Sequence, residues 1–241
     1  METRWLHPVI TGVAVVLSLV VLKRKYQSSN LQESDKVAIG LATFFGAMIG
    51  SRFPFLLGVE SANTVIWFAD GKTILGGIFG GYVAVEITKI LCGIRERTGD
   101  YFAVPVAIAV AGGRLACFFG GCCFGVVSDL PWCFSFPASG DDLLRHPTQL
   151  YEASFHFIWI GILLMLEAKS WLKEKRLAVY LGSYLVFRFL TEMIRPEPQM
   201  FGGLTSYQIA CLLLIIFLVA VEFYWSQFAP PRLRPQESDG I

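Results

Sequence analysis

Charge is scarce in this sequence of 241 residues, because Asp, Glu, Lys and Arg make up 16% of it against about 25% in a soluble globular domain. Neither sign dominates: 20 Lys and Arg stand against 19 Asp and Glu. Without an excess of either sign, nucleic acid and acidic polymers are not indicated as partners. Hydrophobic residues reach 54%, which indicates an integral membrane protein. A span uses about 20 residues, so the chain has room for roughly seven or eight spans and for no separate soluble catalytic domain.

Seven long apolar runs predict an all-α, polytopic integral membrane protein with seven transmembrane helices. The first run has Glu2 before it and a basic cluster after it, so we expect an anchor and not a cleaved signal peptide. We expect residues 1–229 to form one helical domain and the polar tail, residues 230–241, to be disordered. The runs are Pro8 to Leu22, Val37 to Val59, Thr73 to Leu91, Phe102 to Phe119, Gln149 to Leu166, Leu177 to Ile194 and Leu204 to Trp225.

Basic residues outside these runs predict the orientation. Alternate connections, with Lys89 at the inner end of the third run counted among them, carry 13 Lys and Arg on one side and four on the other. Because cytoplasmic loops are enriched in basic residues, we expect the N-terminus outside and the C-terminus in the cytoplasm. The longest connection, the 28 residues 120–147, then lies outside. Its Trp132, Phe134 and Phe136 favour a packed interfacial segment.

Ionisable side chains inside or at the edges of the spans are costly, at about 2.5–3.5 kcal/mol each at a helix centre. For Glu86 and Glu222 we expect structural salt bridges. The arginines outnumber the nearby acids, which indicates an anionic ligand, and a lipid phosphate suits the fork of donors on a guanidinium. The seven residues are Arg52, Glu86, Arg114, Glu152, Arg188, Glu192 and Glu222.

Glycines interrupt the third span and flank the end of the fourth. Alone they indicate close helix packing, whereas beside Arg114 they would also let backbone N–H groups approach a head group. They are Gly76, Gly77, Gly80, Gly81, Gly112, Gly113, Gly120, Gly121 and Gly125.

Several segments, in this order, resemble the signature segments of prolipoprotein diacylglyceryl transferases. They are Gly113-Arg114-Leu115, Arg145-His146-Pro147-Thr148-Gln149-Leu150-Tyr151-Glu152, and Phe187-Arg188-Phe189 with Glu192, Arg195 and Pro196. The resemblance covers about residues 46–214. It implies a bacterial inner-membrane enzyme that moves the diacylglyceryl group of phosphatidylglycerol onto the cysteine thiol of a prolipoprotein. The partners are then phosphatidylglycerol or another anionic phospholipid, and a prolipoprotein signal peptide.

By motif position, the resemblance assigns the head-group phosphate to Arg114 and Arg188. The sequence departs from the family where a His usually precedes the paired glycines of the third span, since this chain has Leu75 there. It also has Cys117 where the family typically has Asn, and Cys122 where the family has a carboxylate. Leucine cannot accept a proton, so the usual base is missing.

The remaining site residues are expected around these two arginines. Arg52 and Arg195 would hold the head group at the rim, and Glu152 and Glu192 would orient the guanidiniums. Gln149 and Tyr151 would donate hydrogen bonds to lipid oxygens. The general base is either His146 or the thiolate of Cys122. His156, four residues after Glu152, is expected to make a structural hydrogen bond.

Four of the six cysteines gather near the outer end of the fourth span. A disulfide of Cys133 with Cys122 or Cys123 is favoured over a catalytic thiolate, and small apolar packing residues are the third interpretation. We expect no cofactor and no metal, because adjacent cysteines on a regular helix point about 100° apart.

Two other functions stay open from the sequence. One is a non-catalytic phospholipid-binding membrane protein that has lost the usual catalytic His, and the other is a thiol-dependent membrane redox protein that acts through Cys122 and Cys123.

Overall fold

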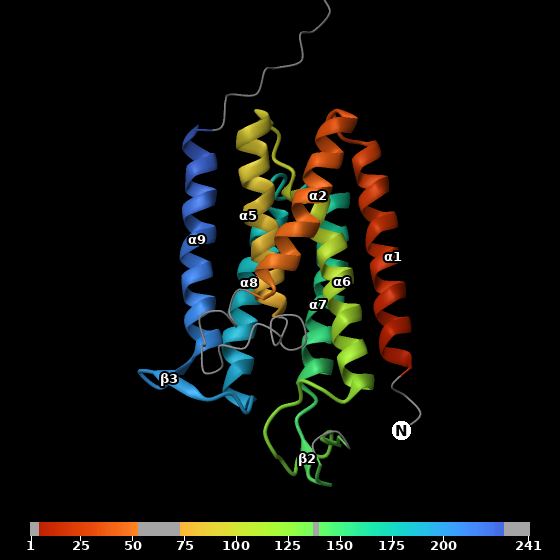
Figure 1. The fold of residues 1–241 in the computed structure, drawn as a ribbon, viewed down its shortest axis with the longest axis vertical. Coiled ribbons are helices and arrows are strands. Elements are labelled where there is room, and N and C mark those ends of the chain that lie inside the picture. Colours follow the sequence, from red (N-terminus) through yellow and green to blue (C-terminus); the bar gives the residue numbers. More distant parts are fainter. Residues whose placement is uncertain (1–4, 53–72, 137–139, 229–241) are drawn as a thin grey trace, which may run out of the picture.

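The computed structural model describes residues 5–52, 73–136 and 140–228. Within these ranges the chain is helical, with short strands at one end of the helices (Figure 1). The helices are α1 (Leu6–Gln27), α2 (Glu33–Gly50), α5 (Ile74–Cys92), α6 (Gly99–Gly120), α7 (Thr148–Ala168), α8 (Arg176–Thr191) and α9 (Ser206–Phe228), and a 3-10 turn, η2 (Glu192–Ile194), extends α8.

Six of the described helices, with α8 extended by η2, are long and apolar enough to cross a membrane: α1, α5, α6, α7, α8 and α9. They match six of the seven predicted spans. The expected second span, residues 37–59, overlaps α2, which is not among the six, and its remainder lies outside the described residues. The expected disordered tail, residues 230–241, also lies outside them.

Glycines let α2 and α5 pack backbone against backbone. A Cβ added to Gly50 would lie 2.3 Å from the carbonyl oxygen of Gly76, and one added to Gly80 would lie 2.3 Å from that of Gly46. No residue with a side chain fits at such a distance without moving the helices apart. The close-packing interpretation is therefore confirmed for Gly76 and Gly80.

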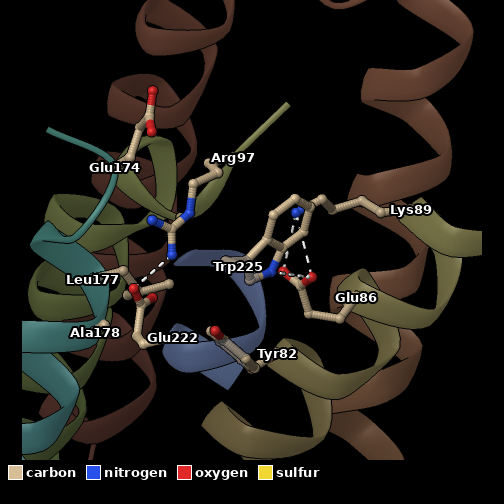
Figure 2. Close-up of a pocket in the computed structure, with 10 residues that line it drawn as sticks. Tyr82, Glu86, Lys89, Arg97, Glu174, Leu177, Ala178, Glu222 and Trp225 are labelled. Atoms are coloured by element: carbon tan, nitrogen blue, oxygen red, sulfur yellow. Dashed lines mark hydrogen bonds and ion pairs between the residues drawn. The ribbon is translucent and has the colours of Figure 1, made fainter. Parts of the chain in front are cut away.

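A network of ion pairs lies at the end of the molecule where α5 and α9 finish (Figure 2). Lys89 pairs with Glu86 at 3.1 Å, and Arg97 pairs with Glu222 at 2.5 Å. The Trp225 indole N–H donates to Glu86 at 3.2 Å. These side chains line a cavity of about 20 Å³, room for about one water molecule. The expected structural salt bridges of Glu86 and Glu222 are confirmed.

Two small hairpins lie at the opposite end, the end at which α1 starts, and the β3 hairpin lies below α9 (Figure 1). Strand β1 (Phe134–Ser135) pairs with β2 (Leu144–Arg145), and β3 (Gln199–Phe201) pairs with β4 (Leu204–Thr205), both antiparallel.

The first hairpin belongs to the long connection between α6 and α7. Phe136 is 3% exposed and stacks on Phe124 with ring centroids 5.2 Å apart, whereas Trp132 is exposed. The segment is packed in part, as expected.

Candidate functional site

A buried ion pair joins α6 to α7 near the hairpin end. The Nε atom of Arg114 lies 2.8 Å from Oε2 of Glu152, and the two side chains are 8% and 3% exposed. The other carboxylate oxygen, Oε1, accepts a hydrogen bond from the Tyr184 hydroxyl of α8 at 2.5 Å. Three helices thus meet at one carboxylate, which fixes the position of the Arg114 guanidinium.

A second buried pair lies at the end of α8. Arg188 Nη2 contacts Oε2 of Glu192 at 2.7 Å, as their spacing of four residues predicts. Oε1 of Glu192 accepts from the Thr205 hydroxyl at 3.2 Å. Arg188 also lies over the ring of Tyr207, 5.0 Å from its centroid. Arg195 is further from Glu192, at 3.8 Å.

The two pairs belong to one charged region. The carboxylate of Glu152 lies within electrostatic reach of both Arg114 and Arg188. Three buried guanidiniums, which include that of Arg195, stand against the buried carboxylates of Glu152 and Glu192. Arg195 also pairs with Glu197 at 3.6 Å, and the Glu197 side chain is 33% exposed. The excess of one positive charge is therefore limited to the five buried side chains, where an anion would balance it.

Arg52 lies in the turn that follows α2. The preceding residue, Ser51, lines a mostly apolar cavity of about 320 Å³. This volume is in the range of small-ligand sites. The cavity reaches Gly113, which precedes Arg114, and an added Cβ there would meet no atom within 4 Å. It is lined by Ser51, Thr73, Ile74, Gly77, Ile78, Ala109, Val110 and Gly113.

The segment before and into α7 links the site to the outer connection. His146 Nδ1 and the Tyr151 hydroxyl are 3.1 Å apart. The Gln149 amide donates to the backbone carbonyl of Cys122 at 2.5 Å, and the Thr148 hydroxyl donates to that of Cys123 at 2.7 Å. The polar groups of Gln149 and Tyr151 therefore make contacts within the chain, and their expected lipid contacts stay predictions.

Gly125 sits where this segment meets the end of α8. Its N–H donates to the His146 carbonyl at 2.8 Å, and the next N–H, of Val126, donates to the Ile194 carbonyl at 2.9 Å. A Cβ added to Gly125 would lie 2.6 Å from the Ile194 oxygen and 2.9 Å from Cγ2 of Thr148. Only glycine fits in this junction.

All six cysteines are free thiols. The expected disulfide of Cys133 is therefore wrong in this structure. The sulfurs of Cys117, Cys122 and Cys123 gather instead, within 4.8 Å of one another. Hydrogen bonds with the Cys117 and Cys122 thiols, and then the positive charges of Arg114 and Arg195, lower the pKa of Cys123 although burial opposes this.

The end of α6 explains this gathering. Gly121 adopts a left-handed conformation with φ of 70°. The N–H of Gly121 then bonds to the Phe118 carbonyl, and the N–H of Cys122 bonds to the Cys117 carbonyl. This is the Schellman motif, which folds the chain back over the last helical turn and brings the residues in the positions of Cys117 and Cys122 into contact. The sequence prediction treated these cysteines as if on a regular helix and missed the reversal.

Buried tyrosines are the site residues that the sequence prediction missed. The Tyr184 hydroxyl donates a hydrogen bond to Glu152, and the Tyr180 hydroxyl is 2.8 Å from Nδ1 of His156. The structural role expected for His156 is confirmed. A signal was present, because Tyr180, Tyr184 and Arg188 follow one another at four-residue spacing on one face of α8.

The position of the usual histidine lies at the start of α5. Leu75 is there, 4% exposed and part of the apolar core. A leucine in that environment neither accepts a proton nor contacts a phosphate.

Comparison with known proteins identifies the family of this chain. The sequence profile of the prolipoprotein diacylglyceryl transferase family matches residues 3–224. A phosphatidylglycerol–prolipoprotein diacylglyceryl transferase of Methylococcus capsulatus is 38% identical, with 85% of this chain and 84% of that protein covered. A transferase of the same name from Wolbachia pipientis is 31% identical over 76% of this chain and 77% of its own length. The chain thus belongs to the prolipoprotein diacylglyceryl transferase family.

Proposed function

We propose that this chain transfers the diacylglyceryl group of phosphatidylglycerol to the cysteine thiol of a prolipoprotein. The observation that supports this most is the group of buried arginines Arg114, Arg188 and Arg195, together with an apolar cavity that is lined by Gly113, the residue before Arg114. A phospholipid offers both an anionic phosphate and apolar chains, which match the two halves of this arrangement. The family match favours this function over a non-catalytic lipid-binding protein and over a thiol-dependent redox protein.

The reaction exchanges one bond at the glyceryl carbon. The acceptor sulfur forms an S–C bond to the carbon that carries the phosphate oxygen, and the C–O bond breaks. The electron pair leaves with the oxygen, so glycerol phosphate departs with a developing negative charge. Guanidiniums fixed before the reaction stabilise that charge without reorganising. Arg114 and Arg188 are held in this way by Glu152 and Glu192.

The acceptor thiol must lose its proton before it attacks. With Leu75 in place of the usual histidine, His146 and the thiolate of Cys122 are the proposed bases. His146 lies at the start of the segment that carries Gln149 and Glu152, and its Nδ1 atom contacts Tyr151. Cys122 is exposed at the same end of the bundle. Arg52, which follows the cavity residue Ser51 in the sequence, is proposed to hold the head group at the rim.

We assign the site to the outer face of a bacterial inner membrane, with the N-terminus outside and the C-terminus in the cytoplasm. The ion pairs at the other end support this, because Lys89 and Arg97 lie there with the basic connections. A reporter active only outside the cytoplasm is expected to work after Ser139 and to fail after Lys173. The reverse result at either position contradicts the orientation.

Complementation tests the function in cells. The chain is expressed in a bacterium depleted of its own transferase, and mature lipoproteins are expected to reappear. In vitro, the purified chain is mixed with phosphatidylglycerol vesicles and a peptide that carries the acceptor cysteine. The expected products are the diacylglyceryl thioether and glycerol phosphate, with phosphatidylethanolamine vesicles as the control donor. If lipid binds but neither assay gives the thioether, the chain is a lipid-binding protein and the proposal is wrong.

A further inference from the structure

Three thiols form a compact group at the hairpin end of the molecule. The sulfurs of Cys117, Cys122 and Cys123 lie within 4.8 Å of one another. Around a tetrahedral ion with metal–sulfur bonds of about 2.3 Å, neighbouring sulfurs are about 3.8 Å apart. Rotamer changes of these side chains are enough to close the difference, which is at most about 1 Å.

The backbone already holds these cysteines in place. The reversal at Gly121 brings Cys122 back to Cys117, and Cys123 follows with a positive φ of 63°. Since Cys122 and Cys123 are not on a helix, the 100° divergence of adjacent helical residues does not apply to them. Their carbonyl groups accept hydrogen bonds from Gln149 and Thr148 of α7. A group of ligands fixed by its backbone loses little entropy when it binds an ion.

We propose that Cys117, Cys122 and Cys123 bind a zinc ion whose fourth position takes the acceptor thiol. Three thiolates select a soft metal ion, and three protein ligands with one open position are the arrangement of catalytic zinc sites. Cys122 is exposed, so an acceptor can reach the open position from solvent. This inference rests on the proposed function. It makes Cys122 a metal ligand in place of a general base, so that the ion, and not a side chain, replaces the missing base.

The chemistry balances without an oxidant. The acceptor thiol binds zinc as a thiolate and releases its proton to solvent water, since a coordinating thiol is deprotonated. The zinc-bound sulfur then forms the S–C bond to the glyceryl carbon, and the C–O electron pair leaves with the phosphate oxygen. The thioether product carries no charge, so it is a weak ligand and leaves the ion. Arg114, which lies within electrostatic reach of Cys123, stabilises the departing phosphate close to the attacking sulfur.

Cobalt binding tests the site without reference to activity. The full chain is purified in detergent with a reductant, stripped of metal with a chelator, and titrated with Co²⁺. We expect one equivalent to bind, with a sulfur-to-cobalt charge-transfer band that Zn²⁺ removes. Cys117→Ser, Cys122→Ser and Cys123→Ser are expected to lose the band, whereas the matched controls Cys92→Ser and Cys133→Ser keep it. No band in the native chain, or a band unchanged in the first three variants, overturns the inference.

A second measurement uses the native chain, so it does not depend on whether a serine variant folds. It records how much Zn²⁺ protects each cysteine thiol from alkylation. In the native chain, Zn²⁺ is expected to slow alkylation of the three clustered cysteines at least tenfold and to leave Cys133 unaffected. The reacted positions are identified by mass spectrometry of peptides. Equal slowing at Cys133, or no slowing at all, contradicts the site.

Transfer assays separate this inference from the proposed function. Metal removal is expected to lower transfer to the peptide at least a hundredfold, while phosphatidylglycerol still binds, and Zn²⁺ is expected to restore it. If the metal-free chain transfers at the native rate, the zinc inference is wrong and the proposed function stands. If the metal-free chain binds Co²⁺ as expected but the zinc-loaded chain transfers nothing, the site stands as a metal site, and both the proposed function and the role of the ion are wrong.

Discussion

Replacement of Glu152 by Gln changes one charge at the centre of the site. The amide still accepts a hydrogen bond from Tyr184, but it no longer neutralises Arg114. Both side chains of the pair are less than a tenth exposed, so the guanidinium is left buried without its partner. Loss of one member of such a pair costs about 3–5 kcal/mol. We expect the free energy of unfolding of Glu152→Gln to fall by that amount.

The measurement is an unfolding titration with a denaturing detergent in mixed micelles. Glu33→Gln is the matched control, because Glu33 also pairs with a basic residue, Lys36, but its side chain is 89% exposed. An exposed pair contributes about 0–1 kcal/mol. If Glu152→Gln and Glu33→Gln are equally stable, Glu152 does not neutralise a buried charge on Arg114, and the argument for the site fails.

Added lipid extends the same experiment. In Glu152→Gln an anionic head group is the available counter-charge for Arg114, so phosphatidylglycerol is expected to stabilise the variant more than the native chain. A ligand at a hundred times its dissociation constant adds about 2.7 kcal/mol. Equal stabilisation of both proteins by this lipid shows that its phosphate does not reach Arg114.

Three further substitutions test separate contacts. Tyr184→Phe removes a hydrogen bond to the buried Glu152 carboxylate and is expected to lower the free energy of unfolding by about 1.5–3 kcal/mol in the same titration. Arg188→Lys keeps the charge but not the fork of donors, so its transfer rate is expected to fall nearly as far as that of Arg188→Ala, and full activity shows that charge alone suffices. Gly80→Ala pushes α2 away from α5 and is expected to lower the free energy of unfolding by about 1–3 kcal/mol. Gly161→Ala is the control, because an added Cβ there meets open space and is expected to leave the free energy of unfolding unchanged. Equal stability of these two variants contradicts the close packing of α2 and α5.

The apolar runs predicted six spans well because a lipid environment imposes both length and hydrophobicity on a helix. The contact of Arg188 with Glu192 also follows from sequence, since four-residue spacing places both on one helical face. The Arg114–Glu152 pair joins different helices, and the need to neutralise buried charge was its only sequence signal.

Other parts of the site depend on geometry that residue types do not specify. The contact of Tyr184 with Glu152 requires the relative rotation of α7 and α8. The gathering of three thiols requires the reversal at Gly121, whereas the expected Cys133 disulfide assumed that proximity in the outer connection was enough. Glycine at the end of a helix indicates that such a reversal is possible, but not which side chains it brings together.

The backbone contacts at Gly125 hold the Arg114–Glu152 pair and the Arg188–Glu192 pair in a fixed relative position. The neighbours of Gly125 are the segment that leads to Glu152 and the end of the helix that carries Arg188, and they approach as closely as backbone atoms permit. Backbone contacts at Gly125 therefore fix the relative position of the segment that leads to Glu152, the partner of Arg114, and of the helix end that carries Arg188, and flexible side chains do not. A head group must fit between guanidiniums held at a fixed distance. We therefore expect the site to discriminate among phospholipids by the size of the group attached to the phosphate, as well as by the charge of the head group.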